Sequence, residues 1–226
     1  MAFTKAFEIT EFQRRIADVK SRMGKAGFDL LMCQDPSNMG YLTGFDGWSF
    51  YTPQAVLVHL DEEWPVWFGR EQDAKSAHIT TDLPAHNIIP FSEPLVHHPT
   101  DHPFDELCDL IKARGWGHVR IGVDFDAHYY TARAHHHITT GLPDAVISDN
   151  RELVNWARLI KSPAEIAYMR EGGRMATKVM ENALAKLAPG VKQYEVMADV
   201  YRDQISGLDG KFGDYTGLCP LIQVGE

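Results

Sequence analysis

The amino-acid sequence predicts an α/β layer domain followed by a segment that is mostly helical. Over residues 1–150, short apolar runs typical of strands alternate with helical patterns. This alternation is typical of a sheet covered by helices. Beyond that point the strand signal almost disappears and two long helical patterns follow. We therefore expect a domain boundary near residues 150–160, and assign residues 1–155 to a first domain and 156–226 to a second.

The strands of the first domain are predicted from apolar runs bounded by turn residues. These runs lie at residues 28–33, 54–60, 64–69, 87–91, 119–124 and 145–149. The second and third runs are joined by the acidic residues 61–63 and are expected to form a hairpin. Pro36, Ser37 and Asn38 are expected to form a turn after the first strand.

The helices of the first domain are predicted from apolar residues that recur every three or four positions. The first helix is expected to begin with a capping box of Thr10 and Gln13, and to stop at Gly24 and Gly27. Three further helices are expected at residues 71–79, 103–115 and 129–140.

The second domain is predicted to contain two helices and one strand. Ser162 is expected to cap a long helix with Pro163 at its first position, and residues 193–205 form the next helix. An inner side of the long helix is predicted at Ile166, Met169, Met175, Val179 and Leu184. Residues 217–224 form a single apolar strand without a partner in the sequence. Because a lone strand leaves its backbone groups unpaired, we expect it to pair with another chain or to remain an exposed edge.

Composition excludes several classes of partner. The net charge is −9 and the pI is about 5.6, which argues against nucleic acid or an anionic membrane surface as a main partner. No run of about 20 apolar residues and no leader-like start are present. Cys33, Cys108 and Cys219 are odd in number and far apart, as expected for reduced thiols in a cytoplasmic protein.

Histidine is the most conspicuous reactive residue type. A potential group of metal ligands lies at His97, His98, Asp101 and His102, although an exposed loop explains the same residues. The three consecutive histidines within residues 134–139 lie on a predicted helix and point in different directions, which favours a solvated face. We assign no metal site to either motif.

Two acidic residues follow a predicted strand end. Asp124 and Asp126 lie where ligands often bind in α/β sheets. No partner base or basic neighbour accompanies them in the sequence, so we assign them no catalytic role.

The stretch "YLTGFDGWSFYTP" concentrates aromatic residues around two glycines, with Asp46 as its only charge. Core packing explains most aromatic residues in proteins. A loop this rich in rings also suits a small cation or a partner subunit, because ring faces attract positive charge. Both interpretations remain open for Tyr41, Phe45, Trp48, Phe50 and Tyr51.

The second domain carries a motif that resembles a known family. The pattern "R…IKSPAEI…MR" over residues 158–170, with Pro189-Gly190 before Glu195, resembles the opening of the catalytic domain in the creatinase/aminopeptidase P/prolidase group, the pita-bread enzymes. The resemblance covers the whole chain. It implies a creatinase-type N-terminal three-layer α/β domain, followed by the first helices and strand of an α+β pita-bread domain.

Within this group the chain resembles the ectoine hydrolases. The resemblance is carried by residues 35–58, 67–74, 114–124, 153–170 and 213–222. It implies an enzyme that opens the cyclic amidine of ectoine to an acetylated diaminobutyrate. It also implies a small ectoine-like substrate and a homodimer, in which the N-terminal domain of one subunit closes over the active site of the other.

The resemblance also indicates site residues. In creatinases the segment matching residues 48–53 sends a phenylalanine and an arginine toward the neighbouring subunit's substrate. Phe50 keeps the phenylalanine, whereas Thr52 stands at the arginine position and argues against creatine as substrate. We therefore expect Trp48, Phe50 and Tyr51 to bind substrate.

The catalytic residues of the group are expected beyond residue 226. The family's catalytic histidine and the metal ligands of its peptidase members have no counterpart in this sequence. We assign no catalytic residue, metal ligand or cofactor to the chain, and expect it to lack hydrolase activity by itself. The metal requirement of a complete enzyme stays open.

Two alternatives remain beside ectoine hydrolysis. One keeps the enzyme class and changes the substrate, as in an Xaa-Pro dipeptidase or a creatinase-like amidinohydrolase. The other is a stand-alone binding or dimerisation module that retains the N-terminal domain.

Overall fold

The computed structural model describes residues 5–47, 49–212 and 222. The chain divides into two compact units, Met1–Ile160 and Lys161–Glu226. Each unit is described below by itself.

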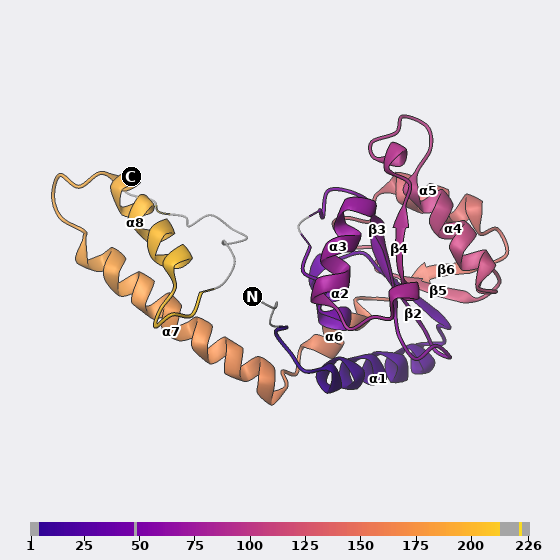
Figure 1. Cartoon of the computed structure of the whole chain (residues 1–226), viewed down its shortest axis with the longest axis horizontal. Coiled ribbons are helices and arrows are strands. Elements are labelled where there is room, and N and C mark those ends of the chain that lie inside the picture. The colour runs from indigo at the N-terminus through magenta and orange to yellow at the C-terminus, as the bar shows by residue number, and fades with distance from the viewer. Residues whose placement is uncertain (1–4, 48, 213–221, 223–226) are drawn as a thin grey trace. The chain divides into compact units, whose positions relative to one another are not determined.

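A six-stranded mixed sheet forms the centre of the first unit (Figure 1). In spatial order the strands are β4 (Ile88–Phe91), β3 (Val66–Arg70), β2 (Ala55–His59), β1 (Leu30–Cys33), β5 (Arg120–Val123) and β6 (Val146–Asp149). The strand β2 pairs antiparallel with β1 and β3, whereas β1–β5, β5–β6 and β3–β4 are parallel pairs. All the strands predicted for this domain, and the hairpin, are confirmed.

Side chains alternate between the two faces of the sheet. In β1, Leu30 and Met32 belong to one buried cluster and Leu31 and Cys33 to the other. All four are buried, as expected for a strand covered on both faces. This explains why the strand reads as a continuous apolar run in the sequence.

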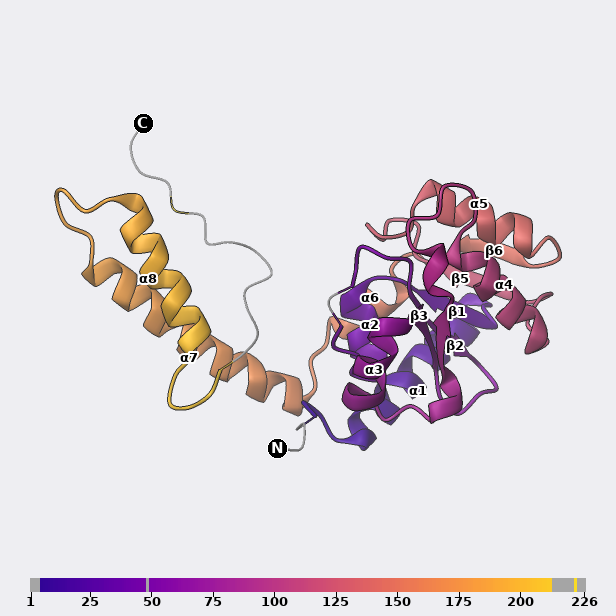
Figure 2. The ribbon, with the colours of Figure 1, turned by 45° about the horizontal axis from the view of Figure 1, so that its top comes forward.

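Helices cover both faces of the sheet (Figures 1 and 2). One face is covered by α1 (Ile9–Ala26), α2 (Pro36–Thr43), α3 (Glu71–Thr80) and α6 (Leu153–Arg158). The other face is covered by α4 (Pro103–Ala113) and α5 (Ala132–Gly141). Two short 3₁₀ helices, η1 (Ala85–Asn87) and η2 (Glu93–Leu95), flank β4. The predicted three-layer α/β fold is confirmed.

The first helix begins earlier than the sequence indicated. It starts at Ile9 after Glu8, whose side chain makes no capping hydrogen bond, so the predicted capping box of Thr10 and Gln13 is wrong. Gly27 ends the helix in the left-handed region at φ 77°, where glycine has no Cβ to clash.

The turn predicted at residues 36–38 is also wrong, because α2 begins there. The carboxylate of Asp35 accepts hydrogen bonds from the backbone N–H groups of Ser37 and Asn38 at 2.9 and 3.1 Å. Pro36 occupies the first turn, where its missing N–H costs nothing. An acidic residue followed by proline therefore started a helix here.

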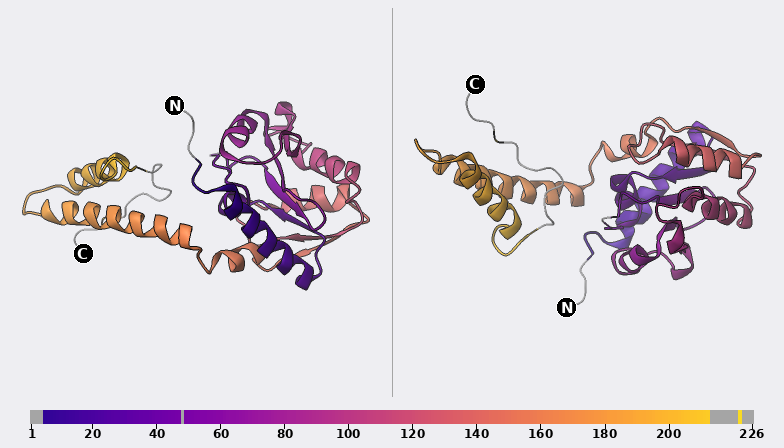
Figure 3. Two further views of the ribbon diagram at one scale, coloured as in Figure 1. Left: turned by 60° about the horizontal axis from the view of Figure 1, so that its bottom comes forward. Right: turned by 90° about the horizontal axis from the view of Figure 1, so that it is seen from above.

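The second unit contains two described helices, α7 (Pro163–Ala185) and α8 (Gln193–Ser206), drawn in orange and yellow in Figure 3. The predicted start of α7 is confirmed by a capping box, in which Ser162 Oγ accepts from the Glu165 N–H at 3.2 Å and the Glu165 carboxylate accepts from the Ser162 N–H at 2.7 Å. Between the helices, Asn182 donates to the carboxylate of Asp203 at 2.9 Å.

The inner side predicted for α7 is only partly correct. Ile166, Met175 and Val179 are half-buried, but Met169 and Leu184 are 57% and 59% exposed. No residue of α7 is buried, and α8 buries only two residues among those described. Apart from Ile222, the strand predicted at residues 217–224 lies outside the described part of the chain.

No helix among the described residues combines the length and the apolar character that crossing a membrane requires.

Candidate functional site: an aromatic surface at one edge of the sheet

Three strand ends meet at one edge of the sheet. Cys33, the last residue of β1, pairs with Val56 at the start of β2, and Met32 pairs with Val123 at the end of β5. The loops that leave this edge therefore lie near one another. In open α/β sheets, ligands commonly bind outside the carboxyl ends of parallel strands.

The segment from α2 to the start of β2 has two groups of aromatic residues. Tyr41 and Phe45 are each 6% exposed and belong to the core. The Phe45 ring packs on Trp67 with centroids 5.2 Å apart. Phe50 and Tyr51 are 36% and 47% exposed.

A tight turn presents these two exposed rings. The N–H of Thr52 donates to the carbonyl of Ser49 at 3.1 Å, and the Thr52 hydroxyl donates to the same oxygen at 3.0 Å. Phe50 and Tyr51 are the central residues of this turn. Thr52 is buried and its hydroxyl is engaged in the turn, so it cannot replace an arginine as a ligand for a carboxylate.

A second loop adds another ring, because the helix predicted at residues 129–140 begins only at Ala132. Tyr129 follows β5, and its ring lies 5.6 Å from that of Phe50, centroid to centroid. Phe50 and Tyr51 contact each other edge to face at 6.0 Å. We call Phe50, Tyr51 and Tyr129 the aromatic surface. Trp48, the third predicted binding residue, lies outside the described residues.

Carboxylates surround the ends of β5 and β6. Burial raises the pKa of the Asp124 carboxyl, and the negative charges of Glu152, Asp149 and Asp126 also raise it. The backbone N–H of Asp126 donates to this carboxyl and lowers its pKa. The four acidic side chains therefore give this edge a negative potential.

Two buried amides at the same edge lack partners. Gln34 directly follows β1 and Gln54 directly precedes β2, and both are buried. Within the described residues, both Nε2 atoms and the Oε1 atom of Gln34 have no hydrogen-bond partner. Because buried polar groups are normally paired, this edge has unmet hydrogen-bonding capacity.

The described cysteines are not nucleophiles. Burial raises the pKa of the Cys33 thiol, and the charges of Asp124 and Asp35 raise it further. Burial also raises the pKa of Cys108, to about 12. Both thiols are buried and protonated at neutral pH.

The two histidine-rich segments, residues 97–102 and 134–139, contact each other in the structure. His102 and His137 stack with ring centroids 4.9 Å apart, and His137 Nδ1 lies 2.7 Å from the Asp105 carboxylate. Of the three consecutive histidines, only His136 is exposed, as a solvated face requires. His135 and His137 are half-buried, and His135 Nδ1 lies 2.8 Å from the Tyr130 hydroxyl. Among the described residues, no three or more His, Cys, Asp or Glu side chains could hold a metal ion together.

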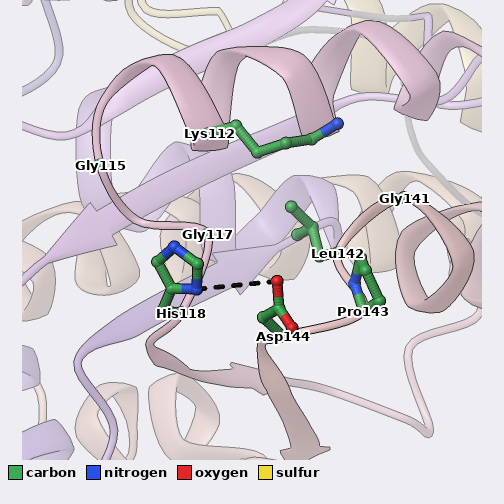
Figure 4. A pocket seen from close by; sticks show the side chains of 8 residues that line it. All are labelled: Lys112, Gly115, Gly117, His118, Gly141, Leu142, Pro143 and Asp144. Carbon is green, nitrogen blue, oxygen red and sulfur yellow. Dashed lines mark ion pairs between the residues drawn. The ribbon is translucent and has the colours of Figure 1, made fainter.

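Two cavities lie at the opposite edge, where β5 and β6 begin. One of about 150 Å³ is flanked by the exposed pair His118 and Asp144, whose Nδ1 and Oδ2 atoms are 3.9 Å apart (Figure 4). The other, of about 350 Å³, is lined in part by the stacked rings of His59 and Trp116. Neither cavity includes a residue of the aromatic surface.

Comparison with known proteins identifies the first unit. The model of the creatinase/prolidase N-terminal domain matches residues 15–160. Among solved structures, an Xaa-Pro dipeptidase from Bacillus anthracis has the same fold, with a TM-score of 0.66 at 21% identity over 85% of this chain and 48% of that chain.

Two relatives match nearly the whole chain. A Sinorhizobium fredii protein with the name "Uncharacterized hydrolase/peptidase y4tM" is 42% identical over 220 residues, or 97% of this chain and 56% of the relative. The ectoine hydrolase of Halomonas elongata is 38% identical over 226 residues, again 97% and 56%. The chain thus spans about half the length of these relatives. With a family domain that matches more than half of its residues, the chain belongs to the creatinase/prolidase family.

Proposed function

We propose that this chain forms the N-terminal part of an enzyme that hydrolyses the cyclic amidine of an ectoine-like substrate. The observation that carries the proposal is the 38% identity to an ectoine hydrolase along 97% of the chain. The exposed rings of Phe50 and Tyr51 support it, because an amidinium is a planar cation that ring faces attract.

The chemistry of this reaction is the addition of water at the amidine carbon. A general base takes a proton from the water as the C–O bond forms, and a carboxylate or histidine stabilises the tetrahedral intermediate. One C–N bond of the amidine then breaks, and its nitrogen takes up a proton to leave as an amine. In this proposal the base and the stabilising side chain lie beyond residue 226. The chain contributes the aromatic side chains Trp48, Phe50 and Tyr51, which close over the active site of a partner subunit in a cytoplasmic homodimer.

A peptidase remains the second candidate. The 42% identical relative carries the name hydrolase/peptidase, and the fold is shared with an Xaa-Pro dipeptidase. Thr52 is buried and offers no charge to a substrate carboxylate; because ectoine, dipeptides and creatine all carry a carboxylate, this residue is neutral among the three substrates.

A chimaeric enzyme tests the proposal. Replacing the matching first half of the Halomonas elongata ectoine hydrolase with this chain should give a protein that converts ectoine to an acetylated diaminobutyrate, measured by mass spectrometry. Xaa-Pro dipeptides and creatine serve as competing substrates in the same assay. The isolated chain should convert none of them. A chimaera that folds as a dimer and cleaves only dipeptides contradicts the proposal.

Variants in the chimaera then test the aromatic residues. Phe50→Ala and Tyr51→Ala should each lower kcat/KM for ectoine by about tenfold, since a desolvated ring is worth ~1–2 kcal/mol to a bound cation. Ile79→Ala is the matched control, because Ile79 is exposed on α3 and lies outside the aromatic surface.

A further inference from the structure

Tyr129 reaches the aromatic surface from a separate part of the chain. Phe50 and Tyr51 precede β2, whereas Tyr129 follows β5, and the 5.6 Å ring contact of Tyr129 with Phe50 joins the two loops. The strand β1 lies between β2 and β5 in the sheet. The contact therefore bridges the edge at which β1 ends.

Backbone hydrogen bonds fix the loop that carries Tyr129. The N–H of Ala127 donates to the carbonyl of Asp124 at 3.2 Å, and the N–H of Tyr130 donates to the carbonyl of Ala127 at 2.9 Å. The Asp124 carboxylate accepts from the N–H of Asp126 at 3.1 Å. Two successive turns, tied to a buried carboxylate, thus position Tyr129 with little freedom.

The neighbouring tyrosines have different surroundings. The hydroxyl of Tyr130 lies 2.8 Å from His135 Nδ1, and its ring stacks on Phe125 at 5.9 Å. The hydroxyl of Tyr129 has no hydrogen-bond partner among the described residues, and its partly exposed ring contacts His128 edge to face at 5.4 Å as well as Phe50. Tyr130 is therefore engaged in the structure of the loop, whereas Tyr129 offers both a ring face and a polar atom.

The local charges favour a cationic ligand. Asp124, Asp126, Asp149 and Glu152 interact at the carboxyl ends of β5 and β6. Arg70 interacts with Tyr51, but its charge is balanced by Glu93, which accepts from Arg70 Nε at 2.8 Å. Aromatic faces and carboxylates at the same edge of a sheet both attract cations.

We propose that Tyr129 is a specificity-determining residue, which forms with Phe50 and Tyr51 a three-ring site for a planar amidinium cation. The site selects a cation over a neutral amide of the same shape. The amidinium as substrate group rests on the proposed function, whereas cation binding at these rings does not. The Tyr129 hydroxyl adds one hydrogen bond to the ligand.

Binding to the 226-residue chain tests the site directly. Acetamidinium and the neutral, equally shaped acetamide are titrated while NMR signals of the chain are recorded. The expected result is a saturable shift of the Tyr129 and Phe50 ring signals with acetamidinium and no such shift with acetamide. Equal shifts with both probes, or none at Tyr129, overturn the proposal.

Three variants separate the ring from the hydroxyl and from the loop. Tyr129→Leu should weaken acetamidinium binding about threefold to tenfold, the loss expected for one ring of a cation site. Tyr129→Phe should retain most of the affinity. Phe125→Leu is the matched control, because Phe125 is an exposed ring of the same loop that stacks on Tyr130. A loss in Phe125→Leu equal to that in Tyr129→Leu overturns the assignment.

The two proposals fail in distinguishable ways. If the chain binds acetamidinium through Tyr129 and the chimaera does not hydrolyse ectoine, the proposed function is wrong and the cation site stands. If the chimaera hydrolyses ectoine with unchanged kcat and KM in Tyr129→Leu, the role in specificity is wrong and the function stands.

Discussion

The two units of the chain bury their apolar residues to very different extents. In the first unit, strands and helices share two clusters of buried side chains, one on each face of the sheet. In the second unit, α7 has no buried residue and α8 has Val196 and Val200, among the residues described. Large side chains such as Leu184 and Tyr194 are 59% and 71% exposed.

This difference shows that local sequence signals can form a helix without forming a buried core. The capping box of Ser162 and Glu165 and the helical sequence that follows are local signals, and they suffice to start α7. A stable core requires layers that cover each other's apolar faces, and only the first unit has them within the described residues. Most of the stability of helices in proteins comes from such packing.

The largest effect is expected when the units are separated. Residues 1–160 alone should unfold in one cooperative transition, whereas residues 161–226 alone should show no sigmoidal transition, because few of their described side chains are buried. Circular dichroism during heating measures both. If residues 161–226 also unfold cooperatively, at a midpoint similar to that of residues 1–160, the two units do not differ in this way.

A matched pair of leucines sharpens the comparison. Leu57 in β2 is 1% exposed, so Leu57→Ala should lower the free energy of unfolding by ~2–5 kcal/mol. Leu184 in α7 is 59% exposed, so Leu184→Ala should change it by no more than ~0.5 kcal/mol. Urea unfolding followed by fluorescence measures both values. Similar losses in the two variants would show that α7 is packed in solution.

Two glycines should respond with opposite signs. A Cβ at Gly141 would lie 2.6 Å from the Sγ of Cys108, so Gly141→Ala should destabilise the first unit by ~1–3 kcal/mol. A Cβ at Gly172, inside α7, would meet nothing within 4 Å, so Gly172→Ala should stabilise that helix by ~1 kcal/mol.

Chemical denaturation measures the Gly141 effect, and amide exchange within α7 measures the Gly172 effect. The variant Cys108→Ala is the control for the first, because it removes the Sγ atom, the nearer of the two atoms that an added Cβ would meet, and leaves the Cβ of residue 108 at 2.9 Å. In that background the additional cost of Gly141→Ala should shrink. An unchanged cost would show that the contact with Sγ does not cause the loss of stability.

The smallest effect concerns pH. The Nδ1 atom of His102 caps α4 by accepting from the N–H of Phe104 at 3.1 Å. The pKa of His102 is lowered from 6.5 to about 4, chiefly by burial and also by the positive charges of His137 and Arg133, whereas Asp105 opposes this shift. The unfolded chain therefore binds a proton that the folded chain does not, and stability should fall as the pH decreases from about 6.5 to about 4.

His102→Asn keeps a capping acceptor that does not titrate. The loss of stability in this pH range, ~1 kcal/mol for a helix cap, should be reduced in this variant. His86→Asn is the control, because His86 is exposed and its side chain caps no helix. Thermal unfolding at a series of pH values measures both. Parallel pH profiles for His102→Asn and the unmodified protein would contradict the assignment.

Local sequence patterns predicted the helices and strands well where a pattern is typical of only one kind of element. The apolar runs before Gln34 and after Gly117 became β1 and β5, and Ser162 with Pro163 began α7. The pattern failed at Asp35 and Pro36, because these residues are equally typical of a turn and of a helix start. Only the continuation of the chain to Gly44 in a hydrogen-bonded helix decided between them.

The candidate site was predicted in part. Gly-flanked aromatic residues indicated a special loop, but the sequence could not separate the buried Phe45 from the exposed Phe50 and Tyr51. Tyr129 was missed because its relation to Phe50 depends on which strands are neighbours. A contact between residues 79 positions apart has no local signal.

The sequence by itself determined the alternation of strands and helices, the start of α7 and the membership in an enzyme family, because each depends on short patterns along the chain. Tertiary structure alone decided which polar and aromatic residues meet. The order of the strands brings the loops of Phe50 and Tyr129 to one edge, and the packing of α4 against α5 stacks His102 on His137. The physical reason is that strand order and helix packing are set by burial on both faces of the sheet, which no single segment encodes.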